Sequence, residues 1–127
     1  MLCLVDGTLM RDGRSIVEHV NLELNRGELT VLIGPNGAGK SSMMSVLSGE
    51  LSLTAGEVLL DDVPVSSYGA SALAERLAVL EQNDLLDFPF LVREVVAMGR
   101  IPHGNTALDV ARIVDEVNET LGLGHLS

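Results

Sequence analysis

Residues 20–25 alternate between apolar and polar positions, a pattern that is typical of a half-buried strand. The apolar members of this pattern are Val20, Leu22 and Leu24. The run ELTVLI over 28–33 follows a turn signal and is rich in branched residues, so it predicts a fully buried strand. Shorter apolar runs predict two further strands, over 57–60 and 78–80.

Helical spacing begins after residue 39. Helices are expected over 40–48, 70–77 and 92–98. The clearest helix has apolar residues three or four positions apart, at Leu108, Ala111, Val114, Val117 and Leu121. Thr106, with Asp109 three residues later, predicts a capping box at its start. Strands that alternate with helices indicate an α/β fold with at least some parallel strand pairing.

Composition narrows the class of protein. The 127 residues fit one domain, and the apolar runs are too short to span a bilayer. No basic stretch leads a long apolar segment and Cys3 is the only cysteine, so a cytoplasmic chain is expected. With 8 basic against 18 acidic residues the net charge is −10, which disfavours nucleic acid as a partner.

A glycine-rich loop follows the expected strand over 28–33 and precedes the expected helix. Gly34, Gly39, Lys40 and Ser41 match the phosphate-loop pattern G-x-x-x-x-G-K-[ST]. Glycines let successive backbone N–H groups curl around phosphate oxygens, and a helix that starts there adds the positive end of its dipole. Lys40 supplies a point charge for the β- and γ-phosphates, and the Ser41 hydroxyl is a ligand for Mg²⁺. The loop therefore predicts nucleotide binding.

The longer stretch LIGPNGAGKSS resembles the Walker A loop of ABC-transporter ATPases. The segments LNRGELTVLIG, LSGELSLTAGEVLLDDVPV and AVLEQNDLLDFPFLVREVVAMGR also resemble that family, and the last of them places Gln82 at the Q-loop. Together these segments cover most of the chain, from about Val20 to Arg100. FPFLVREVVAMGRIPHG is similar to import ATPases for haem and iron chelates, most of all to those of hemin importers, although siderophore and cobalamin importers share much of it.

The resemblance implies a P-loop NTPase fold of the ABC type: a β-rich start, the Walker A strand, loop and helix, and the beginning of the helical subdomain. It implies ATP and Mg²⁺ as cofactors. It also implies that Ser41 and Gln82 act at the Mg²⁺ ion, with Gln82 near the attacking water. The implied nucleotide-binding residues are Gly34, Pro35, Asn36, Gly37, Ala38, Gly39, Lys40, Ser41 and Ser42.

The resemblance further implies partners and a location. The complete protein would form a head-to-tail homodimer with a second ATPase subunit. It would dock under membrane permease subunits through the surface around 85–90, and a periplasmic solute-binding protein would act indirectly. Such a protein is peripheral on the cytoplasmic face of the inner membrane and couples ATP hydrolysis to import of hemin or an iron chelate.

Several family features are absent from this sequence. The signature sequence, the Walker B aspartate with its catalytic glutamate and the switch histidine do not occur, so 1–127 is expected to be a partial nucleotide-binding domain that is inactive alone. No aromatic residue precedes Tyr68, and Leu9, Met10 or Arg11 occupies the region of the family's adenine-stacking aromatic. Ser42 stands where threonine is usual.

Two other classes remain open from the residues alone: a different P-loop phosphotransferase, and a non-catalytic nucleotide-binding fragment. A GTPase would need a guanine-reading N-K-x-D motif, which the sequence lacks. The three histidines lack the spacing of metal ligands, so a zinc site is not expected. Asp61 and Asp62 are adjacent carboxylates but are expected to form a turn.

Overall fold

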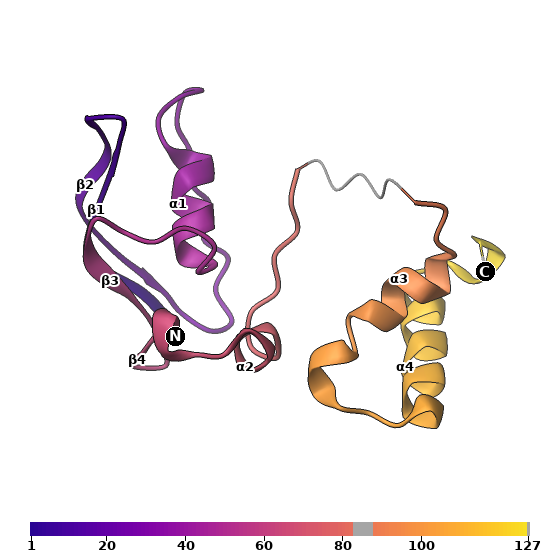
Figure 1. Ribbon diagram of the computed structural model, residues 1–127. Coiled ribbons are helices and arrows are strands. Elements are labelled where there is room, and N and C mark those ends of the chain that lie inside the picture. The colour runs from indigo at the N-terminus through magenta and orange to yellow at the C-terminus, as the bar shows by residue number, and fades with distance from the viewer. Residues whose placement is uncertain (83–87, 127) are drawn as a thin grey trace. The chain divides into compact units, whose positions relative to one another are not determined.

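The computed structural model describes residues 1–82 and 88–126. The chain separates into two compact units, Met1–Leu73 and Ala74–Ser127. The first unit is a sheet with a helix on one face, and the second is a pair of packed helices (Figure 1). Among the described residues, none of the helices combines the length and the apolar character that crossing a bilayer requires.

The first unit is built on a four-stranded sheet. The strands are β1 (Leu2–Arg11), β2 (Arg14–Leu24), β3 (Ala55–Leu60) and β4 (Val63–Pro64). Their order is β2-β1-β3-β4, and every neighbouring pair is antiparallel. The predicted strand over 57–60 is confirmed as β3, and the alternation from Val20 to Leu24 is the last part of β2.

β1 and the first half of β2 were not predicted, because bulges interrupt their alternation. The register of the pair shifts between Leu4 and Gly7 and again between Gly7 and Leu9. Asp6 and His19 lie in these bulges with φ of 47° and 50°, and His19 Nδ1 lies 2.7 Å from Asp6 Oδ1. This hydrogen bond and the charge of Asp6 raise the pKa of His19.

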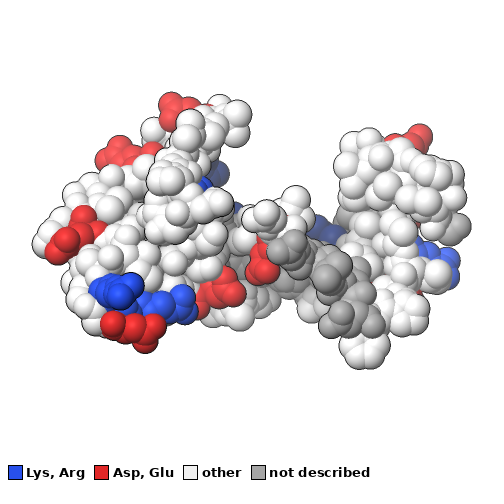
Figure 2. Space-filling view, turned by 90° about the horizontal axis from the view of Figure 1, so that it is seen from above, with Lys and Arg blue, Asp and Glu red and all other residues white. Residues whose placement is uncertain are grey.

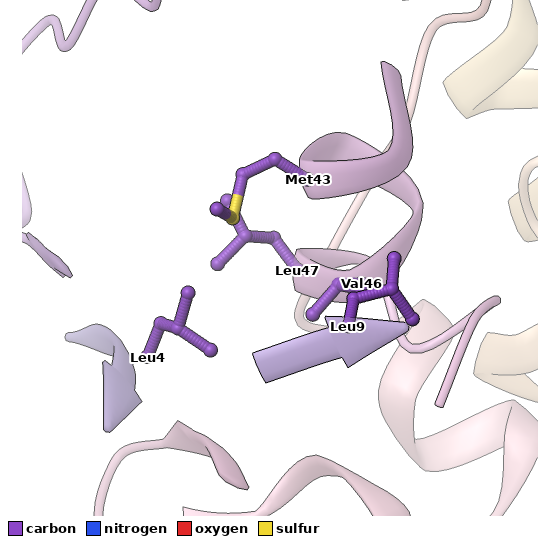
Figure 3. Close-up of a cluster of buried hydrophobic side chains, with 5 residues drawn as sticks. All are labelled: Leu4, Leu9, Met43, Val46 and Leu47. Atoms are coloured by element: carbon purple, nitrogen blue, oxygen red, sulfur yellow. The ribbon is translucent and has the colours of Figure 1, made fainter. Parts of the chain in front are cut away.

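Helix α1 (Lys40–Leu47) packs on one face of the sheet. The buried cluster comprises Leu4, Leu9, Met43, Val46 and Leu47 (Figure 3). Three members are one face of α1 and two belong to β1, so burial of these side chains, at about 25 cal/mol per Å² of apolar surface, fixes the helix on the sheet. The predicted helix over 40–48 is confirmed to within one residue.

Three expectations about strands are wrong in this structure. Residues 28–33 do not form a strand, and the side chains of Leu29 and Ile33 are 92% and 87% exposed. Residues 78–80 do not form one either, and all observed strand pairs are antiparallel. A strand needs a neighbour for its N–H and C=O groups, and no described strand pairs with either segment.

The adjacent carboxylates Asp61 and Asp62 form the predicted turn. Both have positive φ, 50° and 64°, and they join β3 to β4 where Leu60 pairs with Val63. Asp61 also binds the N-terminal ammonium at 2.6 Å and Arg26 at 2.8 Å, and these cations lower its pKa. The pair is therefore structural.

The second unit is helical. Helix α3 (Val92–Met98) packs against α4 (Ala107–Thr120), and both match their predicted positions. The predicted capping box is confirmed: Asp109 N–H donates to Thr106 Oγ1 and Thr106 N–H donates to Asp109 Oδ2, each at 3.3 Å.

The remaining short elements are spread over both units. They are η1 (Val65–Ser67), α2 (Ala70–Ala74, shorter than the predicted 70–77), η2 (Ile101–His103) and η3 (Gly124–Leu126).

Candidate phosphate-binding site

The site begins where the glycine loop enters α1. The first helical hydrogen bond runs from Met43 N–H to Gly39 O at 2.9 Å. The N–H groups of Lys40, Ser41 and Ser42 therefore have no acceptor within the helix, as in the first turn of any helix. No acidic side chain lies in this turn, so the positive end of the helix dipole is not neutralised there. This arrangement favours an anion at the start of α1.

Gly39 anchors the loop on the sheet. Its φ is +91°, in the left-handed region that favours glycine. A Cβ atom on this residue would lie 2.9 Å from Ile16 Cγ2 and 3.2 Å from the Ile16 carbonyl oxygen. The backbone of the loop thus lies directly against β2, and only glycine fits both the torsion and the space. Sequence reasoning missed Ile16 as the loop's support, since it did not predict this part of β2.

Lys40 is the only lysine of the chain, and its side chain lies within the loop. Its Nζ donates to the carbonyl oxygens of Gly34 at 2.5 Å and Pro35 at 2.7 Å. A turn between Pro35 and Ala38, closed by a 3.2 Å hydrogen bond, carries the chain around it. The loop therefore gathers one full positive charge and the first-turn N–H groups of α1 at one place.

The other predicted site residues divide between the two units. Residues 34–42 come together as one loop and helix start, with Ser41 exposed and Ser42 half-buried. Gln82 lies in the second unit, in an exposed turn, so its role at Mg²⁺ stays a prediction. No three His, Cys, Asp or Glu side chains gather into a metal site anywhere in 1–82 or 88–126. Any Mg²⁺ at this loop would thus depend on the Ser41 hydroxyl, phosphate oxygens and water.

Comparison with known proteins decides the family. The family model for the ABC transporter matches residues 17–127, which include the whole glycine loop, α1 and both helices of the second unit. The chain belongs to the ABC transporter family. The chain is also similar to a solved structure titled "Structure of ATP binding subunit of ABC transporter". The TM-score is 0.76 at 21% identity, and the match covers 88% of this chain and 46% of the other. That likeness confirms the fold.

Curated ABC relatives match nearly the whole chain. It is 43% identical over 120 residues to the hemin import ATP-binding protein HmuV of Plesiomonas shigelloides, covering 94% of this chain and 45% of the relative. The HmuV of Hahella chejuensis is 44% identical over 122 residues, with 94% and 46% covered. That of Pseudomonas aeruginosa is 39% identical over 127 residues, with 100% and 50% covered. The chain thus spans about half the length of these relatives.

Proposed function

We propose that this chain binds Mg-ATP through residues 34–42. The arrangement of Lys40 supports the proposal most directly, because its ammonium is held inside the loop, at the start of a helix whose first N–H groups have no helical acceptor. In this assignment the loop N–H groups and Lys40 hold the β- and γ-phosphates, and Ser41 Oγ ligates Mg²⁺. When bound, the Mg²⁺ ion neutralises charge on the phosphates.

We infer further that the complete protein is the ATP-binding subunit of an importer for hemin or an iron chelate. The relatives named as hemin import proteins support this, and so does the FPFLVREVVAMGRIPHG segment, from Phe88 to Gly104. The inferred assembly is a homodimer on the cytoplasmic face of the inner membrane, bound to permease subunits. Gln82 would join Ser41 at Mg²⁺ in that assembly.

The permease-docking surface is proposed at Phe88 and Phe90; the other residues of the expected surface, 85–87, lie outside the described part of the chain. Phe88 is 72% exposed and Phe90 43%, and their rings meet edge to face at 6.3 Å. Such exposure of two aromatic rings favours a contact surface over a packed cluster.

Phe88→Ser should weaken co-purification with a permease. The variant is tested in a chimera that joins this chain to the second half of the Pseudomonas aeruginosa relative. That relative is chosen because its match covers all residues of this chain. An aromatic side chain that becomes buried on binding contributes about 2 kcal/mol or more, so its loss should lower recovery of the complex at least about tenfold. Leu108→Ser, at another exposed apolar residue, is the matched control. Equal recovery of parent and Phe88→Ser would refute this docking surface.

Two glycine substitutions test the geometry of the phosphate loop. Gly39→Ala should lower Mg-ATP affinity by about tenfold or more, because a left-handed alanine costs about 1–2 kcal/mol and its Cβ would collide with Ile16. Gly34→Ala should stay within about threefold of the parent, since its Cβ would make only ordinary van der Waals contacts, with Ala38 Cβ at 3.4 Å and with Lys40 Cδ at 3.8 Å. Titration calorimetry compares them. Equal losses in the two variants would mean that the Ile16 contact does not set the loop.

A further inference from the structure

The segment of β2 that supports the phosphate loop, residues 16–19, has little ladder pairing of its own. Ile16, which contacts Gly39, is left out of the register between β1 and β2, and the next irregularity begins at Glu18. Val17 is thus the one residue of this segment that pairs with β1. β2 is the outermost strand of the described sheet, so the segment has no described strand on its other side. Backbone pairing alone therefore holds it weakly.

Side chains close the two bulges beside this segment. In one bulge, the N–H of Asp6 donates to Asn21 Oδ1 at 2.9 Å, and Asn21 is the single residue of β2 between the flanking pairs. In the other, the N–H of His19 donates to Thr8 Oγ1 at 3.1 Å, and Thr8 is the single residue of β1 between its flanking pairs. Each bulged residue is thus bonded by the side chain that opposes it, in place of a ladder partner.

The side chains of the two bulged residues also contact each other. His19 Nδ1 lies 2.7 Å from Asp6 Oδ1, so one contact spans both bulges and joins β2 to β1. Asp6 is held from the other side by β3, where Gly56 lies so close to the Asp6 carbonyl oxygen that a Cβ atom would not fit between them. Asp6 is therefore the fixed member of the pair, and His19 is the member through which β2 is attached.

The strength of this contact depends on a proton. A protonated imidazole pairs with the charge of a carboxylate, whereas a neutral imidazole offers at most an uncharged hydrogen bond. The charged groups that act on His19 among the described residues are Asp6 in β1 and Glu18 in β2. The hydrogen bond to Asp6 raises the pKa of His19 most, and the charges of Asp6 and Glu18 raise it further.

The charge of the whole chain acts in the same direction. The net charge is −10, and Figure 2 shows Asp and Glu side chains at several places on the surface. A negative field favours the protonated form of a histidine. Because the pair of Asp6 and His19 is exposed, salt screens this effect.

We propose that Asp6 and His19 form a proton-dependent clasp, which holds residues 16–19 against β1 and thereby positions the phosphate loop. Its effect on nucleotide binding rests on the proposed function. With His19 protonated, Ile16 stays against Gly39 and the loop keeps its path. With His19 neutral, the clasp weakens, and nucleotide binding must also order this segment. His19 is thus a positioning residue, which acts through Ile16 and does not touch the nucleotide.

Urea unfolding without ligand tests the clasp by itself. The variants are His19→Asn and Asp6→Asn, because asparagine tolerates the positive φ of both positions. A raised histidine pKa stabilises the folded chain at low pH, and this stabilisation is lost as pH rises through the folded pKa. The parent should therefore exceed both variants in urea midpoint at about pH 6, and the difference should shrink toward about pH 8.5.

The unfolding experiment has an internal reporter and two controls. Tyr68 is the only tyrosine and lies in the first unit, so its fluorescence follows the unit that contains the clasp. The double variant should lose no more than either single variant, since both substitutions remove the same contact. His125→Asn removes a histidine of the second unit and should follow the parent at both pH values.

Calorimetric titration with Mg-ATP tests the positioning role. At about pH 6 the parent should bind about two- to fourfold more tightly than His19→Asn, as expected for an exposed charge pair. At about pH 8.5 the two affinities should converge. The nucleotide itself titrates in this range, but it does so equally for the parent, His19→Asn and the control His125→Asn.

The outcomes separate the clasp from the loop. Equal urea midpoints of the parent and both variants at every pH would overturn the clasp. Midpoints that depend on pH, together with equal Mg-ATP affinities, would overturn the positioning role and leave a contact that affects stability alone. An affinity difference that stays constant with pH would overturn the dependence on the proton. If the parent does not bind Mg-ATP, the proposed function and the positioning role fail together, and the urea midpoints alone decide the clasp.

Discussion

The 127-residue chain should bind Mg-ATP yet release phosphate at least about a hundredfold more slowly than a full-length relative such as that of Plesiomonas shigelloides. Hydrolysis requires that the γ-phosphate is held, Mg²⁺ placed, the attacking water oriented and the developing charge stabilised. In the proposed site, Lys40 and Ser41 would serve the first two requirements. No aspartate and glutamate follow an apolar strand in this sequence to serve the others. Removing one preorganised group typically costs about 10²–10³ in rate, which sets the expected minimum.

Phosphate release is measured on monodisperse protein, with Lys40→Ala as the background control. Monodispersity matters because the apolar side chains of 29–33 are exposed, and such a segment favours association through backbone pairing. Turnover comparable to the relative and dependent on Lys40 would contradict the view that this chain lacks the hydrolytic groups. The alternative of a small P-loop phosphotransferase would then be favoured.

Local pattern was sufficient for the elements whose stabilising contacts are close in sequence. α1, α3 and α4 were predicted within a residue or so, because each has an apolar face and a recognisable start or end, such as the capping box of Thr106 and Asp109. The β3–β4 turn was predicted from two adjacent aspartates, which tolerate positive φ better than most residues. The glycine loop was predicted because its motif is contiguous.

Features that depend on distant residues were not predicted. The double bulge at Asp6 and His19 interrupts the period of two, so β1 carried no strand signal although Leu4 and Leu9 are buried in the core. Residues 28–33 carried a strong strand signal, yet no described strand pairs with them. The prediction failed because side-chain pattern does not reveal whether a neighbouring strand is available. The contact of Gly39 with Ile16 and the hydrogen bond between Asp6 and His19 likewise appear only once the register of β1 and β2 is known.

In the proposed site, Lys40 and its loop hold the phosphates of a nucleotide. Lys40→Ala removes the only lysine and both of its contacts to the loop carbonyls without disturbing the buried face of α1. A charged hydrogen-bonding group of this kind contributes about 1.5–3 kcal/mol, so affinity for Mg-ATP should fall by about tenfold to a hundredfold. Arg26→Gln, at a surface pair of the same unit, is the matched control and should bind like the parent.

Titration calorimetry of the parent, Lys40→Ala and Arg26→Gln with Mg-ATP is the most direct test. We expect the parent and Arg26→Gln to bind with equal affinity, and Lys40→Ala to bind about tenfold to a hundredfold more weakly. Binding of Lys40→Ala with the affinity of the parent would contradict the assignment of residues 34–42 as a phosphate-binding loop.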